Sequence, residues 1–61
     1  MKIIILGGGE SGVGEAVLAK KKGLEVFLSD RGAIKEHYKK QLQAEGIDFE
    51  EGTHSEERIL D

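Results

Sequence analysis

The feature that most constrains this chain is an apolar run that ends in a cluster of glycines. Met1–Leu6 contains three consecutive isoleucines without polar alternation, which is typical of a strand buried on both faces of a parallel sheet. The next six residues carry the spacing Gly7-x-Gly9-x-x-Gly12, and so short a glycine-rich stretch indicates a tight turn. The sequence therefore predicts a buried strand that turns sharply into the next element.

The segment after the turn has a helical pattern. Residues 13–22 are predicted to form a helix, because apolar side chains recur on one face at Val13, Ala16 and Val17. Three lysines complement the dipole of the last turn, and Gly23 is the expected left-handed residue that ends the helix.

The rest of the chain repeats the alternation of strand and helix. Residues 24–28 predict a second strand closed by a turn at 29–32, and residues 47–50 predict a half-exposed or edge strand. Between them a helix is expected from about residue 33 to 45, ended by Gly46, with a sheet-facing side formed by Ile34, Tyr38 and Leu42. Residues 53–56 match a capping box for a last short helix.

The resulting order, β-α-β-α-β-(α), predicts an α/β fold of the Rossmann-like three-layer type. Its parallel sheet is expected to have the strand order 3-2-1 with right-handed crossovers. Residues 1–61 are interpreted as the N-terminal part of a single nucleotide-binding domain, truncated before the fourth strand. The unpaired edge of the first strand, or the sheet face that the helices leave bare, is then expected to mediate self-association.

The strand–turn–helix context makes the glycine pattern a candidate nucleotide site. A helix N-terminus offers free N–H groups and partial positive charge to a phosphate, and the glycines give the tight turn, ligand access and close packing. The alternative is a glycine-rich turn that binds nothing. Glu10 is interpreted as solvated and pointing outward. Ser11 has two interpretations that do not exclude each other, as a hydroxyl donor to a phosphate and as a cap of the helix.

Asp30 and Arg31, at the end of the second predicted strand, are the other candidates. Asp30 either accepts hydrogen bonds from ribose hydroxyls or is a solvated turn residue that caps the next helix. Arg31 either contacts a base or a phosphate or is a free surface side chain. The candidate binding residues are Gly7, Gly9, Glu10, Ser11, Gly12, Asp30 and Arg31, and no catalytic or metal-binding residue is identified.

Composition excludes several other functions. Without cysteine the chain forms no disulfide and no thiolate metal site, and no basic face interleaved with aromatics indicates nucleic-acid binding. The only long apolar run is much shorter than the about 20 residues that span a bilayer. A cytoplasmic location is therefore expected, and Glu50 and Glu51 are interpreted as solvated charges.

Four segments together resemble the N-terminal domain of the Mur ligase family. They are residues 3–14, 26–31, 46–47 and 52–54. The similarity is greatest to the members that add D-glutamate to UDP-N-acetylmuramoyl-L-alanine in peptidoglycan synthesis. The family often has an apolar residue where this chain has Glu10, and its Ser-Pro-Gly turn after the fourth strand is absent from the chain.

The resemblance implies that the chain binds the UDP part of that substrate. Gly9, Glu10 and Ser11 would lie at the diphosphate and uridine, and Asp30 and Arg31 at the uracil. ATP and magnesium would bind in later domains, so the chain alone is expected to hold no cofactor and to be inactive. The alternative is an NAD(P)-binding half-domain of an oxidoreductase or regulatory module, and a third possibility is a chain that by itself binds nothing.

Overall fold

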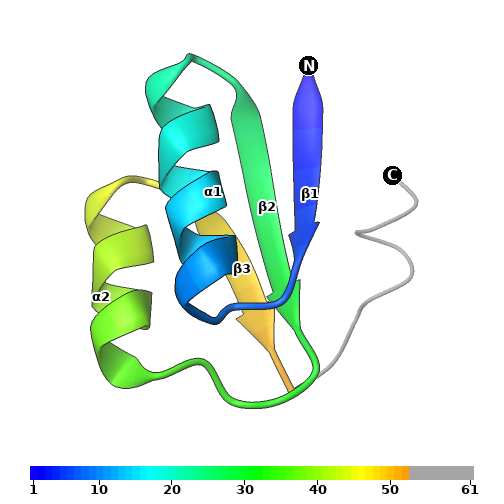
Figure 1. The fold of residues 1–61 in the computed structure, drawn as a ribbon, viewed down its shortest axis with the longest axis vertical. Helices are drawn as coiled ribbons and strands as arrows, with labels where there is room; N and C mark the ends of the chain where they lie inside the picture. Colours follow the sequence, from blue (N-terminus) through cyan, green and yellow to red (C-terminus); the bar gives the residue numbers. More distant parts are fainter. Residues whose placement is uncertain (53–61) are drawn as a thin grey trace.

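Three parallel strands and two helices alternate along the chain in the computed structural model, which describes residues 1–52 (Figure 1). The elements in chain order are β1 (Lys2–Leu6), α1 (Glu10–Lys21), β2 (Glu25–Asp30), α2 (Glu36–Ala44) and β3 (Asp48–Glu51). The predicted alternation is therefore confirmed through its third strand. The final helix predicted from residue 53 onward lies outside the described residues.

β2 is the central strand of the described sheet, and β1 and β3 pair with it in parallel on its two sides. Leu6 is in register with Ser29, and Ser29 with Glu50. This confirms the predicted order 3-2-1, and the third strand, predicted as half-exposed or at an edge, lies at an edge of the sheet that residues 1–52 form. It also brings the C-terminal ends of all three strands to the same end of the sheet, where ligands bind in open α/β folds.

Both helices cover the same face of the sheet (Figure 1), so the described residues supply two of the three predicted layers. Apolar side chains of the sheet and the helices meet there in one core, in which Leu28 and Leu42 are fully buried. The other buried members of this core are Ile5, Val13, Ala16, Val26, Ile34 and Ile47. Burial of such side chains supplies most of the stabilisation available to so short a chain.

The second strand is longer than its sequence pattern predicted. Ser29 and Asp30, interpreted as part of the closing turn, belong to β2 because they pair with Glu50 and Glu51 of β3. Strand pairing between distant segments thus overrides the turn preference of Ser and Asp. The consequence for the site is that Asp30 is fixed by the sheet.

Both helices begin at residues other than those predicted. α1 begins at Glu10, three residues early, and its N-cap is Gly9, which makes no side-chain cap. α2 begins at Glu36, three residues late, after an extended Lys35. The predicted helix ends are confirmed, because Gly23 and Gly46 have φ of 84° and 71° and follow the two helices.

Candidate functional site

The glycine loop runs from the end of β1 into the first turn of α1, and its conformation requires glycine at Gly7 and Gly12. Gly7 has φ of 113°, a region that only glycine adopts readily, and its N–H donates to the Ser29 carbonyl at 2.7 Å. At Gly12, an added Cβ would overlap the Gly7 carbonyl oxygen. The roles predicted for the first and last glycines, a tight turn and close packing of the helix, are therefore confirmed.

Gly9 differs from both, because it faces open space. Its φ of −83° is accessible to any residue, and a Cβ added there would meet no atom within 4 Å. This open surface agrees with the interpretation that Gly9 leaves room for a ligand to approach the backbone. No ligand contact is needed to explain Gly7 or Gly12, whereas the packing of the chain gives no reason for a glycine at Gly9.

A surface pocket of about 490 Å³ lies at this N-terminus of α1. It brings together the five loop residues predicted as ligands, and its complete lining is Ile5, Leu6, Gly7, Gly9, Glu10, Ser11, Gly12 and Glu15. The N–H groups of the first helical turn have no partner within the helix, so they are available to an anion. The carboxylates of Glu10 and Glu15 oppose that attraction.

Ser11 does not cap the helix, so one of its two interpretations is wrong. The helix begins one residue earlier, at Glu10, and Gly9 occupies the N-cap position. Ser11 is exposed in the first turn and lines the pocket, where its hydroxyl remains available as a donor.

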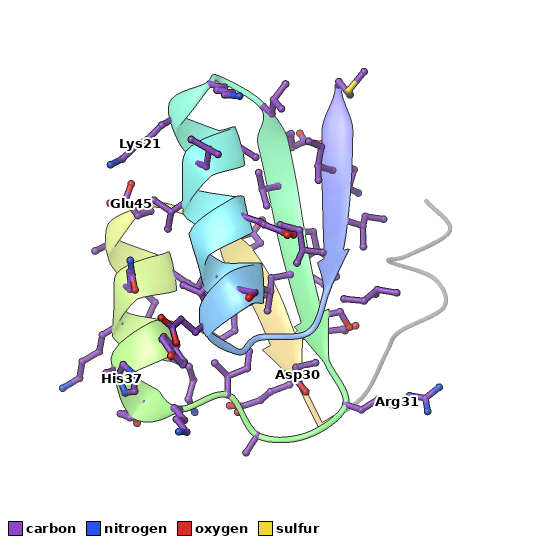
Figure 2. The ribbon with its side chains drawn as sticks, viewed as in Figure 1. Lys21, Asp30, Arg31, His37 and Glu45 are labelled. Carbon is purple, nitrogen blue, oxygen red and sulfur yellow. The ribbon has the colours of Figure 1, made fainter. Side chains whose placement is uncertain are left out.

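Asp30 lies at the same end of the sheet as the loop, where β2 ends (Figure 2). Its Oδ2 accepts the Gly8 N–H at 2.6 Å, and its Oδ1 accepts the Gly32 N–H at 2.8 Å. It does not cap α2, which begins six residues later, at Glu36. The structure therefore gives Asp30 a role that its sequence position did not predict, as an acceptor for the backbone of the glycine loop.

Arg31 is the predicted site residue that stays apart from the loop. Its side chain is exposed and points away from the body of the molecule (Figure 2). Within residues 1–52 it makes no hydrogen bond or ion pair. It does not line the pocket at the N-terminus of α1.

Two carboxylates interpreted as solvated instead hold the structure around the site. Glu50 Oε2 accepts the hydroxyl of the fully buried Ser29 at 2.7 Å. Glu51 accepts the backbone N–H of Ile34 through Oε1 at 2.9 Å and the Lys39 ammonium through Oε2 at 2.7 Å. These hydrogen bonds join segments that are 12 to 21 residues apart, so no local sequence signal indicated them.

Ile34, whose N–H is held by Glu51, also contacts the glycine loop. A Cβ added at Gly8 would lie 2.8 Å from Ile34 Cγ1 and 3.2 Å from Asp30 Oδ2, so only glycine fits at this position without movement of its neighbours. Gly8 stands at a variable position of the pattern Gly7-x-Gly9-x-x-Gly12, so the pattern did not predict that glycine is required there. The one available signal was its place inside a run of three glycines.

Other kinds of site receive no support from the part of the chain that the structure describes. Residues 1–52 contain no group of three or more His, Asp or Glu side chains able to hold a metal ion. In the same range, neither helix has the length and apolar character needed to cross a membrane.

Comparison with known proteins gives one consistent result. The MurD N-terminal domain family matches residues 2–61. A UDP-N-acetylmuramoylalanine–D-glutamate ligase of Christiangramia forsetii is 57% identical over 60 residues, covering 98% of this chain and 14% of the relative. The proteins of the same name from Bacteroides fragilis and Chlorobium chlorochromatii are 58% and 43% identical, over 97% and 92% of the chain.

The similarity is confined to a small part of each relative. The chain spans 12–14% of the length of these three proteins. No solved structure matches the chain significantly.

Proposed function

Because the chain belongs to the MurD N-terminal domain family, we propose that it is the UDP-binding segment of a ligase that joins D-glutamate to UDP-N-acetylmuramoylalanine in peptidoglycan synthesis. The observation that carries the proposal is the family match over residues 2–61. The names of the relatives, at identities up to 58% over almost the whole chain, agree with it.

The diphosphate of the substrate is proposed to bind in the pocket at the N-terminus of α1. The first-turn N–H groups and the Ser11 hydroxyl donate to its oxygens, and Gly9 leaves the space that a phosphate needs. Asp30 and Arg31, near the end of β2, are proposed to lie on the uridine side. Glu10 borders the same pocket, and the net attraction for the anion is reduced by its charge.

The ligation itself is proposed to take place on other parts of the enzyme. With magnesium bound, the γ-phosphoryl group of ATP would be transferred to the carboxylate of the substrate, giving an acyl phosphate and ADP, and the amine of D-glutamate would then displace phosphate to form the amide. The described residues supply binding and orientation, and none of them is assigned a role at the reacting atoms. The reaction is proposed to occur in the cytoplasm.

A dinucleotide-binding function is the second candidate. It is favoured by the strand–glycine loop–helix unit and by an acidic residue at the end of β2, both of which occur in NAD-binding domains. The two candidates differ in the nucleotide that binds and in the enzyme to which the chain contributes.

A chimeric enzyme tests the proposal. In this chimera, residues 2–61 of the chain replace the aligned segment of the C. forsetii ligase. We expect D-glutamate to be joined to UDP-N-acetylmuramoylalanine, with UDP competing against that substrate and NAD having no effect. The unmodified C. forsetii ligase is the matched control. A folded chimera that binds NAD and not UDP would contradict the proposal and support the second candidate.

A further inference from the structure

The loop that borders the pocket is attached at two successive residues to the end of β2. Gly7 N–H donates to the Ser29 carbonyl at 2.7 Å, and Gly8 N–H donates to Asp30 Oδ2 at 2.6 Å. The first attachment uses backbone on both sides, so it is independent of side-chain identity. The second depends on a carboxylate at Asp30, and hydrogen bonds to an ionised acceptor are stronger than neutral ones.

The attachment at Gly8 is also enclosed sterically. Ile34 is only 3% exposed, and its side chain packs over Gly8 closely enough to exclude a Cβ there. The backbone N–H of Ile34 is held in turn by Glu51 at 2.9 Å. The position of the loop is therefore fixed from β2 and, through Ile34, from β3.

The attachment determines which loop donors face the pocket. The N–H groups of Gly7 and Gly8 are both used within the fold, so the donors that remain for an anion are those of the first turn of α1. A loop with three consecutive glycines has high conformational freedom when unattached. Holding it in one conformation lowers the entropy lost when a ligand binds.

From these contacts we infer that Asp30 is a positioning residue: its carboxylate holds the glycine loop in the conformation that presents the first-turn N–H groups of α1 to the diphosphate. This inference rests on the proposed function and deepens it, because it assigns Asp30 an effect on the phosphates that is transmitted through Gly8. It differs from a direct contact of Asp30 with the nucleoside, which would act on ligands with or without phosphates.

The experiment uses the chimera with Asp30→Asn as the variant and Asp48→Asn as the matched control. Asp48 undergoes the same chemical change, is exposed on β3, and its side chain has no hydrogen bond or ion pair with another described residue. Inhibition constants are measured for UDP and for uridine, which share the nucleoside but differ in the phosphates. Hydrogen exchange of the peptide that covers residues 5–13 gives a second readout that is independent of binding.

We expect Asp30→Asn to weaken UDP binding by about tenfold more than uridine binding, the effect of one hydrogen bond to a charged group, and to leave the KM for D-glutamate unchanged. Exchange of the loop peptide should accelerate in this variant while peptides of β3 keep their rates. Asp48→Asn should change neither readout.

Two results would overturn the inference. If Asp30→Asn weakens the binding of UDP and of uridine equally, Asp30 acts only by contacting the nucleoside directly. If the variant has the UDP affinity and the loop hydrogen exchange of the wild type, the loop does not depend on Asp30. Failure of the wild-type chimera to bind UDP would instead reject the proposed function, and the inference with it.

Discussion

Lys39 Nζ lies 2.7 Å from Glu51 Oε2, while the other oxygen of the same carboxylate accepts the Ile34 N–H at 2.9 Å. One side chain at the end of β3 thus holds both α2 and the segment that leads into it. The hydrogen bond from Lys39, and then that from Ile34, lower the pKa of Glu51 below its usual 4.5. The hydrogen bond to Glu51 likewise raises the pKa of Lys39 above its usual 10.5.

The stability contributed by this pair should depend on pH in a defined direction. Because the pKa of Glu51 is lowered in the folded state, its ionised carboxylate stabilises the fold above pH 4.5. This contribution to stability is lost as the pH falls through the pKa of the folded state. Because the pKa of Lys39 is raised in the folded state, its ammonium group stabilises the fold below pH 10.5. This contribution is lost as the pH rises through the pKa of the folded state. Glu51→Gln should therefore lower the midpoint of thermal unfolding at pH values between these limits. The difference from wild type should shrink toward about pH 3, where the Glu51 carboxylate becomes protonated.

The decrease in the thermal midpoint caused by Glu51→Gln should be small. The side chains of Lys39 and Glu51 are 25% and 33% exposed, and exposed ion pairs contribute little to stability. Thermal unfolding of the chain followed by circular dichroism across this pH range measures it. Glu25→Gln, at an exposed position on β2, is the control. A pH-independent difference between Glu51→Gln and wild type would contradict the assignment.

The element order and the core could be predicted from sequence because both depend on local patterns. The apolar run of β1, the helical spacing of Val13 and Ala16, and the glycines after each helix are visible within a few residues. Helix starts could not be predicted in the same way. Gly9 caps α1 without a side-chain hydrogen bond, and α2 begins only after the extended Lys35, in a segment that Glu51 of β3 holds through the Ile34 N–H.

Contacts between distant residues of the candidate site could not be predicted from the sequence. The loop residues Gly7, Gly9, Glu10, Ser11 and Gly12, which the glycine pattern singled out, line one pocket. The contacts of Asp30 with Gly8, and of Ile34 with Gly8, join residues more than twenty positions apart. Such contacts follow from the parallel register of β1 and β2, which no single segment encodes.

Substitution of Gly12 tests the packing of the loop. Gly12→Ala should destabilise the chain by about 3 kcal/mol, since its Cβ would overlap the Gly7 carbonyl and overpacking costs typically 1–3 kcal/mol. Gly9→Ala is the matched control and should destabilise the chain by no more than about 1 kcal/mol, because its Cβ enters open space at an allowed φ and only the preference for Gly over Ala at the N-cap is lost. Urea unfolding measures both variants. Equal stability of Gly12→Ala and Gly9→Ala would contradict the observed packing.

The same Gly9→Ala variant should separate binding from stability. Its Cβ would enter the pocket in which the diphosphate is proposed to bind. In the chimera, UDP should therefore bind about tenfold more weakly, a loss equivalent to one overpacked methyl group. Competition of UDP against the substrate measures this effect. Unchanged UDP affinity would place the phosphates elsewhere.

Self-association of the isolated chain is predicted from the edge of β1. β1 pairs with β2 on one side only within the described sheet, and Leu6 is 64% exposed. Leu6→Lys should weaken association in sedimentation experiments, because a charge on an edge strand opposes pairing with another copy. Leu18→Lys, at a site 57% exposed on α1, is the control and should associate as wild type does. A chain that stays monomeric at all concentrations would contradict the prediction.

Glu10 should reduce the affinity of the pocket for an anion. It is exposed in the first turn of α1 and lines the pocket, where its charge and the diphosphate would repel each other. At 4 Å in bulk water that repulsion is about 1 kcal/mol, so Glu10→Gln should tighten UDP binding by about fivefold. The gain should decrease as salt is added, because surface charges are screened.

Glu15→Gln is the control for this charge effect, because Glu15 also lines the pocket but lies about one turn further along α1. Its removal should increase UDP affinity by less than Glu10→Gln does. Competition assays on the chimera at low and high ionic strength provide the measurement. Weaker UDP binding by Glu10→Gln would show that the carboxylate is itself a ligand of the uridine, since only a lost contact can outweigh the removal of a repulsive charge. Equal and salt-independent effects of the two variants would show that neither charge is near the phosphates.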